Sequence, residues 1–465
     1  MFLEIDKKPT QKEAMVDDIG SVTYGDLVDF ISNYHSLISK RCLIIILCEH
    51  SAATVAEFVA SIENRVVPLM LGHDTDDQIV RNYISTYKPS YIWLPSRLLS
   101  KYGYEPIAEY RDSALVKLYD EPTPMYDELS LLLTTSGSTG SPKLVRHSYA
   151  NVEATALNVS QAFGLKDDER AMISLPVNFT QGLSTVTSCL LVGGTALLTR
   201  ATLVQRPFWR MMKEQHATSF TGVPYSYEIL DKLKFTQMEL PDLRIINQGG
   251  GRLTDAMFQK LSNYAKQTGK KFIASYGSTE TTSRMAILPP ELAEYKTGSI
   301  GKAICNGHID ICDDDGSVIT ETGKIGELVY SGANVTLGYG ECTEDLLKGD
   351  ERHGKYMTGD LAYADEDGCF FIVGRKKRFL KLFGYRIGLD ETERLLKQNF
   401  GFDAACVGTD KKMIIYITAD CDCESVILFL QNKTGINGHA FEVRKIDSLP
   451  KNESGKTLYS RLSNS

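Results

Sequence analysis

The sequence has no long apolar segment and no large excess of basic charge. The longest purely apolar run near its start, Cys42–Cys48, is far too short to cross a bilayer. The 465 residues carry a net charge of -8 without a dense Lys/Arg cluster, which argues against a nucleic-acid partner and a membrane surface. The residues after Met1 lack the apolar core of a secretory signal, so export is not expected.

The ten cysteines show no regular spacing along the chain. Such a set fits reduced thiols in a cytoplasmic protein better than a disulfide framework. The close pair Cys421 and Cys423 has no second pair to complete a four-ligand zinc site, so we expect it to be incidental. We therefore predict a cytoplasmic location.

Segments typical of strands and of helices alternate along most of the chain. The continuously apolar run Cys42–Cys48 fits a strand buried on both faces, and the next segment, 51–64, fits a helix with Ser51 as its N-cap. Short strands are also expected at 91–95 and 271–278. This alternation predicts an α/β fold with large, mostly parallel sheets.

A second domain is expected near the carboxyl end. Asp367-Gly368 is a hairpin signal, and a charged segment, Gly374–Arg378, interrupts the apolar pattern that follows it. About ninety residues then carry their own helix and strand patterns. We predict a large α/β domain over residues 1–374, a hinge at 375–377 and a small, mobile α+β domain over 378–465.

A polar loop follows the apolar run Leu129–Leu133. Between Thr134 and Lys143 the chain places mainly hydroxyl side chains, two glycines and a proline. Glycine amides and hydroxyls can cradle phosphate oxygens, and a lysine adds a point charge. The loop is not a Walker P-loop, because Pro142 precedes Lys143 and no Gly-Lys pair occurs. Taken alone, it could also be a plain polar turn.

Other motifs along the chain decide between these two interpretations. "TSGSTGSPK", "SYGSTE", "GELVYSGANVTLGY", "YMTGDLA", "GRKKRFLKLFGYRIGLDETE" and "LPKNESGKTLYSRL" occur in that order between Thr134 and Leu462. This set resembles the motifs of the adenylate-forming (AMP-binding) enzymes, which include acyl- and aryl-CoA synthetases, adenylation domains of peptide synthetases and firefly luciferase. The resemblance implies that a carboxylic acid is activated by ATP as acyl-AMP, with release of pyrophosphate, and is then transferred to a thiol.

The resemblance also implies roles for individual residues. Thr279 would contact the α-phosphate, Glu280 would hold Mg²⁺, and Lys456 would carry most of the adenylation chemistry as a third catalytic residue. Asp360 would accept hydrogen bonds from the ribose hydroxyls, and Tyr276 would stack on adenine. The positions expected to bind ATP are Thr135, Ser136, Gly137, Ser138, Thr139, Gly140, Lys143, Gly249, Gly250, Gly251, Ser275, Tyr276, Gly277, Ser278, Asp360 and Arg375.

Domain rotation between the two half-reactions is a further implication of the resemblance. Lys377 falls at the hinge position, and Gly384 would leave room for a pantetheine thiol. The thiol would belong to coenzyme A or to the phosphopantetheine of a carrier protein. ATP and Mg²⁺ complete the expected cofactors.

The acid pocket departs from two patterns within the family. Phe179 stands where acyl-CoA ligases often have a histidine, and Thr180 stands where amino-acid adenylation domains place an aspartate. Because Thr180 cannot pair with an α-ammonium, we expect a small or medium acid, apolar or hydroxylated, without an α-amine. Tyr225 and Tyr276 are expected to line the same pocket. Two alternatives stay open: an amino-acid-activating enzyme that resembles the D-alanine ligases and loads a carrier protein, and a non-catalytic nucleotide-binding relative.

Overall fold

The computed structural model describes residues 1–134, 143–376, 378–382, 385–409, 411–434, 436–452 and 455–462. The chain divides into two compact units. Unit 1 comprises Met1–His308 and Tyr330–Tyr356, and unit 2 comprises Ile309–Val329 and Met357–Ser465. Unit 2 thus takes in a segment from well before the predicted hinge at 375–377. The hinge itself, as the point of a rotation, stays a prediction.

The first sheet of unit 1 is parallel at its centre and antiparallel at both edges. Its strands, from one edge to the other, are β16 (Lys302–Ala303), β15 (Ser283–Leu288), β14 (Lys271–Ser278), β13 (Ile245–Gln248), β12 (Ser219–Gly222), β10 (Arg170–Ile173), β11 (Thr195–Leu198), β1 (Glu13–Val16) and β2 (Ser21–Thr23). The strands from β14 to β1 pair in parallel, whereas β15 and β2 run antiparallel to their neighbours.

The second sheet of unit 1 also has a parallel centre. Its order is β19 (Gly338–Gly340), β9 (Leu144–Ser148), β8 (Leu129–Thr134), β4 (Val67–Gly72), β3 (Leu43–Cys48), β5 (Tyr91–Pro95), β7 (Ser113–Lys117) and β6 (Ala108–Tyr110). The pairs β3–β4, β3–β5 and β4–β8 are parallel. The expected α/β architecture with mostly parallel sheets is confirmed.

The continuously apolar sequence of strand β3 is explained by its burial on both faces. Ile44 and Ile46 pack into one core cluster together with α2 (Ala52–Glu63) and α6 (Thr180–Leu191). Ile45 and Leu47 pack into a second cluster with α3 (Asp77–Tyr87) on the other face. The strand is therefore covered on both faces, as expected of a central parallel strand. Helix α2 (Ala52–Glu63) begins as predicted, with the Ser51 hydroxyl accepting a hydrogen bond from the Thr54 amide.

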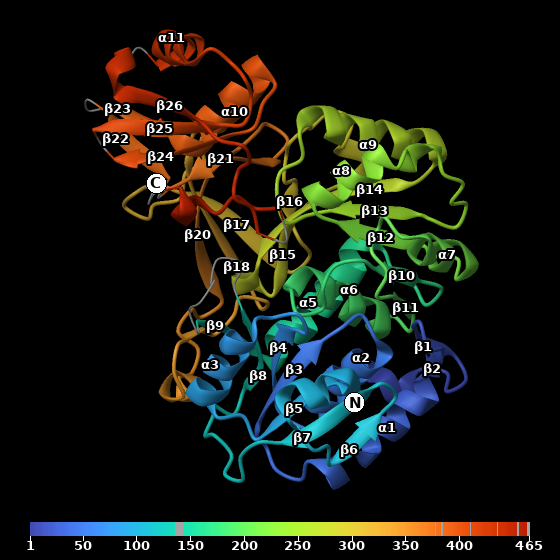
Figure 1. Cartoon of the computed structure of the whole chain (residues 1–465). Helices are drawn as coiled ribbons and strands as arrows, with labels where there is room; N and C mark the ends of the chain where they lie inside the picture. Colours follow the sequence, from blue (N-terminus) through green and yellow to red (C-terminus); the bar gives the residue numbers. More distant parts are fainter. Residues whose placement is uncertain are drawn as a thin grey trace. The chain divides into compact units, whose positions relative to one another are not determined.

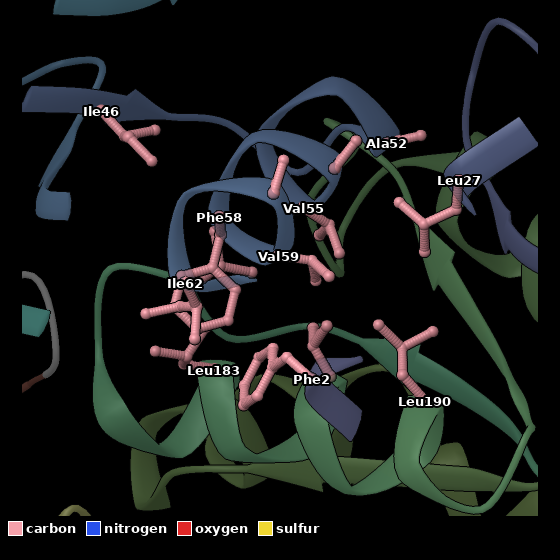
Figure 2. Close-up of a cluster of buried hydrophobic side chains, with 14 of the residues drawn as sticks. Phe2, Leu27, Ile46, Ala52, Val55, Phe58, Val59, Ile62, Leu183 and Leu190 are labelled. Atoms are coloured by element: carbon pink, nitrogen blue, oxygen red, sulfur yellow. The ribbon is translucent and has the colours of Figure 1, made fainter. Parts of the chain in front are cut away.

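The helices of unit 1 cover the faces of these sheets (Figure 1). In Figure 2, Phe58, Val59 and Ile62 of α2 face Leu183 and Leu190 of α6, so this layer forms a shared core with residues of both sheets. Burial of such side chains stabilises the unit by about 1.5–3 kcal/mol each. The helices are α1 (Tyr24–Leu37), α2, α3 (Asp77–Tyr87), α4 (Leu99–Tyr102), α5 (Tyr149–Phe163), α6 (Thr180–Leu191), α7 (Arg206–Glu214), α8 (Pro224–Lys232) and α9 (Asp255–Thr268).

Unit 2 is a smaller α+β unit with its own apolar core. Its first sheet has the order β17 (Gly307–Cys312), β18 (Gly326–Gly332), β20 (Lys355–Ala364) and β21 (Phe370–Arg375). The predicted Asp367-Gly368 turn joins β20 to β21, and Gly368 has the positive φ of 70° that favours glycine. The rest comprises β22 (Phe379–Leu382), β23 (Tyr385–Gly388), α10 (Leu389–Phe400), β24 (Ala404–Thr409), β25 (Lys412–Ile417), α11 (Cys423–Thr434) and β26 (Phe441–Lys445).

Within the described ranges, no helix is both long enough and apolar enough to cross a bilayer. This agrees with the absence of long apolar runs from the sequence.

Candidate active site

The Thr279–Glu280 pair lies where β14 turns back into β15. The two residues open a short 3-10 helix, Thr279–Thr281, and Thr282 then takes a left-handed conformation with φ 55°. Strand β15 runs antiparallel to β14, with Gly277 opposite Arg284. A side chain at Gly277 would collide with the Ser283 carbonyl, because a Cβ there would lie 1.6 Å from that oxygen. Gly277 is therefore required for the close return of the chain.

The segment Asn334–Thr336 holds this turn in place. The Asn334 amide nitrogen donates hydrogen bonds to the carbonyls of Thr281 (2.8 Å) and Arg284 (3.1 Å). The Thr336 amide and hydroxyl both donate to the Glu280 carbonyl at 3.0 Å. Both side chains are buried. The motif "SGANVTLGY" thus fixes the backbone on which Glu280 stands.

The Glu280 carboxylate is oriented by Tyr339, a residue to which the sequence assigned no role. The Tyr339 hydroxyl donates a 2.8 Å hydrogen bond to Glu280 Oε1. Burial, and next the Glu280 charge, raises the pKa of Tyr339 well above its ordinary value, so the phenol keeps its proton and stays a donor. Tyr339 is the last residue of the quoted motif "GELVYSGANVTLGY", and this position in a family motif was the one sign in the sequence that Tyr339 could belong to the site.

Two cations lie against the Tyr339 ring. The Lys143 ammonium is 3.8 Å from the ring centroid, and the Arg352 guanidinium carbon is 4.6 Å from it. Arg352 also donates to the Glu280 carbonyl at 3.2 Å. A carboxylate, a phenol and two cations therefore converge at the end of β14, in a form suited to a polyanion with a bound divalent cation.

Behind the turn lies a buried histidine, His147 on β9. Its Nδ1 is 3.1 Å from the Thr282 hydroxyl, which itself donates to the Asn334 carbonyl at 2.8 Å. That hydroxyl can therefore only accept from Nδ1, which assigns the proton to Nδ1. Burial, and to a lesser extent the charge of Arg352, lowers the pKa of His147 to about 3. The imidazole is neutral at working pH and supports the turn.

The glycine run after β13 is closely packed. A Cβ at Gly249 would lie 2.2 Å from Gln181 Nε2 and 2.7 Å from Ser275 Oγ, and Gly250 has φ 76°. Gly249 is needed for space and Gly250 for its backbone conformation. Ser275 is buried, and its hydroxyl donates to the Gln248 carbonyl at 2.9 Å. Ser275, Tyr276, Gly277 and Ser278 are the last four residues of β14, so these predicted ATP-binding residues lie together at the carboxyl end of one strand.

The predicted acid-pocket residues differ in exposure. Phe179 is the N-cap residue of α6, Thr180 is its first residue, and both are partly buried. Tyr276 on β14 is also partly buried, whereas the Tyr225 side chain is 51% exposed. The assignment of all four to one pocket stays a prediction.

Three further predicted residues belong to unit 2. Asp360 on β20 is buried and pairs with Arg375 on β21, with 2.7 Å between Oδ1 and Nε. Lys456 is exposed in a turn in which its amide donates to Asn452 Oδ1 and its carbonyl accepts from the Asn452 amide, both at 2.9 Å. This turn fixes the backbone of Lys456.

The phosphate-loop positions lie outside the described residues, namely Thr135, Ser136, Gly137, Ser138, Thr139 and Gly140. The hinge residue Lys377 and the thiol-tunnel residue Gly384 lie outside them too. The strands that flank the loop are described: β8 and β9 pair antiparallel, with Thr134 opposite Leu144. On its other side β9 pairs with β19, with Tyr339 opposite Val145, and the ammonium of Lys143, the last loop residue, lies beside the Tyr339 ring.

The fold is that of an α/β protein, and the polar cluster at the end of β14 is suited to a polyanion. A family model described as AMP-binding enzyme matches residues 3–340, well over half of the chain. The chain therefore belongs to the AMP-binding enzyme family, which confirms the resemblance drawn from the motifs.

Curated relatives and solved structures agree with this assignment. The chain is 28% identical to an oxalate–CoA ligase of Arabidopsis thaliana over 82% of this chain and 73% of the relative. It is 31% identical to a 2-succinylbenzoate–CoA ligase of Bacillus pumilus over 58% and 54%. O-succinylbenzoate coenzyme A synthetase of Bacillus subtilis, in complex with ATP and magnesium, has the same fold at TM-score 0.80 and 22% identity, over 99% of this chain and 98% of that one. The expectation of an AMP-forming acid–thiol ligase is confirmed.

Proposed function

We propose that the cluster at the end of β14 binds the polyphosphate of ATP while a carboxylic acid attacks the α-phosphorus. A carboxylate oxygen forms the new P–O bond, the bond to the β-phosphate breaks, and acyl-AMP and pyrophosphate result. A thiol, having lost its proton, then attacks the acyl carbon, and AMP leaves with the bridging oxygen. The observation that carries the proposal is the Glu280 carboxylate, held by Tyr339 beside the cations Lys143 and Arg352.

The residues present fit a magnesium ion held mainly by phosphate. Among the described residues, no group of three or more His, Cys, Asp or Glu could hold a metal. Mg²⁺ needs no such group, because it is usually bound through one or two carboxylates together with substrate phosphates and water. Glu280 supplies one carboxylate, whose Oε1 is occupied by Tyr339. When bound, Mg²⁺ would neutralise part of the charge on the phosphates.

The protein residues lower the barrier by placing positive charge and donors where negative charge develops. Lys143 and Arg352 would face the β- and γ-phosphates, and Thr279 would donate to the α-phosphate. Lys456 would approach the reacting atoms only in the adenylating arrangement, since a lysine is a compact charge on a flexible stem. Asp360 would accept hydrogen bonds from the ribose hydroxyls through its carboxylate oxygens.

The names of the relatives favour coenzyme A as the thiol that accepts the acyl group. The curated relatives cited above are both named as CoA ligases. A carrier-protein phosphopantetheine is the alternative. Amino-acid activation is the second candidate, and the uncharged Thr180 at the start of α6 speaks against it. A cytoplasmic location stays our proposal, in keeping with ten cysteines that are all free thiols.

Pyrophosphate release tests the proposal directly. The purified chain is incubated with ATP, Mg²⁺ and a panel of aliphatic, aryl, hydroxy, dicarboxylic and amino acids, with and without coenzyme A. We expect acid-dependent pyrophosphate release, and thioester formation when coenzyme A is present. If no acid supports release although ATP binds, the chain is a nucleotide-binding relative and the proposal is wrong. If only amino acids support it, the amino-acid-activating alternative replaces it.

A further inference from the structure

Arg284 is a buried cation among neutral groups. It lies on β15 directly after the Thr279–Ser283 turn and is 3% exposed. Its Nη1 donates to the hydroxyls of Ser184 (2.6 Å) and Ser283 (3.2 Å), and its Nη2 donates to Asn247 Oδ1 (3.0 Å). Its Nε is buried and has no hydrogen-bond partner among the described residues. Within the described part of the chain, every acceptor of this guanidinium is therefore an uncharged side chain.

A second buried arginine shows what a structural role looks like in this fold. Arg146 on β9 is fully buried, and it pairs with the Glu351 carboxylate. It also donates to backbone carbonyls, that of Tyr339 at 2.9 Å among them. A buried charge is costly unless it is paired and hydrogen-bonded, and Arg146 meets both conditions. Arg284 has no carboxylate partner among the described residues, so its burial needs another explanation.

The charge of Arg284 persists at neutral pH. Burial lowers the pKa of its guanidinium to about 10, which still leaves it protonated near pH 7. The ring centroid of Phe163, at the end of α5, lies 5.1 Å from the guanidinium carbon. An aromatic face offsets only a small part of the lost hydration.

The contacts of Arg284 connect it to the elements expected to bind the acid. Ser184 lies one turn after Thr180 on α6, so the two share a helix face. Asn247, at the end of β13, donates through Nδ2 to the Ser275 hydroxyl at 3.2 Å. That hydroxyl and Gln181 Nε2 fill the space beside Gly249. Helix α6 and strands β13, β14 and β15 thus converge around the guanidinium.

We propose that Arg284 binds a second carboxylate of the substrate, which makes the substrate a dicarboxylic acid. The inference rests on the proposed function, because it concerns the acid activated at that site. One carboxylate attacks ATP, and the other meets the guanidinium, whose planar fork matches carboxylate geometry and whose buried Nε has no hydrogen-bond partner among the described residues. The hydroxyls of Ser184 and Ser283 can rotate to donate to the same carboxylate. This proposal replaces the apolar or hydroxylated acid expected from Phe179 and Thr180 with an acid that carries a second carboxylate.

A matched acid panel tests the proposal. ATP–pyrophosphate exchange is measured for linear and aromatic dicarboxylic acids and for the monocarboxylic acid of the same skeleton in each case. The proteins are the wild type, Arg284→Lys, Arg284→Met, and Arg244→Met as a control. Arg244 directly precedes β13 of the same sheet and pairs with the exposed Asp168 and the buried Glu169. We expect the wild type and the control to prefer dicarboxylic acids by about 100-fold or more in kcat/KM. Arg284→Met should lose this preference, and Arg284→Lys should keep part of it.

Each result has one meaning. Wild-type exchange that favours monocarboxylic acids, or treats both kinds alike, overturns the role of Arg284 while the proposed activity stands. Equal loss with both kinds of acid in a folded Arg284→Met variant also overturns it, since it would indicate a structural role. If that variant does not fold, the wild-type panel decides the question. Absence of exchange with any acid contradicts the proposed activity itself.

Discussion

Tyr339 donates a 2.8 Å hydrogen bond to the Glu280 carboxylate while its ring contacts the Lys143 ammonium 3.8 Å from the centroid. One side chain from the second sheet thus orients the Glu280 carboxylate at the end of β14 and has Lys143 against its ring. Lys143 and Glu280 are 137 positions apart in the sequence, and Tyr339 brings them to one site. The account of nucleotide binding depends on this arrangement.

Glu280→Gln should raise the Mg²⁺ requirement of adenylation. The change removes the anionic oxygen that we assign to the metal and keeps the shape of the side chain. We expect the Mg²⁺ concentration at half-maximal pyrophosphate exchange to rise about tenfold or more. Glu291→Gln, at an exposed position on the next short helix, serves as the control. An unchanged magnesium titration would remove Glu280 from the metal site.

Tyr339→Phe should weaken the same site less severely. The substitution removes one hydrogen bond to a charged group and keeps the ring over which Lys143 and Arg352 lie. We expect adenylation to fall about tenfold, measured by pyrophosphate exchange at subsaturating Mg²⁺. Tyr295→Phe, at a side chain that is 73% exposed, is the control. Wild-type rates at every Mg²⁺ concentration would show that the hydroxyl does not orient the carboxylate.

Lys456→Ala should separate the two half-reactions. Acyl-AMP formation should fall about 100-fold or more, because a charge aimed at the reacting atoms is lost, while thioester formation from supplied acyl-AMP should stay largely intact. Lys451→Ala provides a matched control, since Lys451 is exposed on the other arm of the same turn. Equal losses in both half-reactions would contradict a role confined to adenylation.

His147 should make the folded protein sensitive to acid. The folded pKa of about 3 lies below the unfolded value of 6.5, so between these values only the unfolded chain binds the proton. The stabilising contribution is complete above pH 6.5 and is lost as pH falls toward 3. From pH 7 to pH 5 the wild type should lose about 2 kcal/mol more unfolding free energy than His147→Gln, measured by urea unfolding. His35→Gln, at an exposed position, should follow the wild type; parallel curves for His147→Gln would refute the assignment.

Local patterns in the sequence predicted much of the fold. Strand β3 was visible because both faces of a central parallel strand must be apolar, and Ser51 was visible because a helix needs a hydroxyl acceptor at its start. Asp367-Gly368 indicated a hairpin for the same kind of local reason. Unit 2 was harder to predict, because Ile309–Val329 joins residues from Met357 onward through pairing between distant strands.

The candidate site was predictable where a motif carries the chemistry within a few residues. Thr279 and Glu280 follow β14 directly, and the motif places both there. Tyr339 and Arg352 were missed because they contact Glu280 only in the folded chain, far from it in the sequence. Arg284 was missed because a charged residue after a polar turn is ordinarily exposed, and nothing local shows that β15 turns it inward.

The direct test of the central claim is the fate of oxygen from the acid carboxylate. An acid that supports pyrophosphate release is labelled with ¹⁸O in its carboxyl group and turned over with ATP, Mg²⁺ and coenzyme A, and the nucleotide product is analysed by mass spectrometry. Attack of the carboxylate on the α-phosphorus predicts AMP that carries one ¹⁸O atom, with no label in pyrophosphate. Formation of ADP and labelled phosphate, or of AMP without label, would contradict the account.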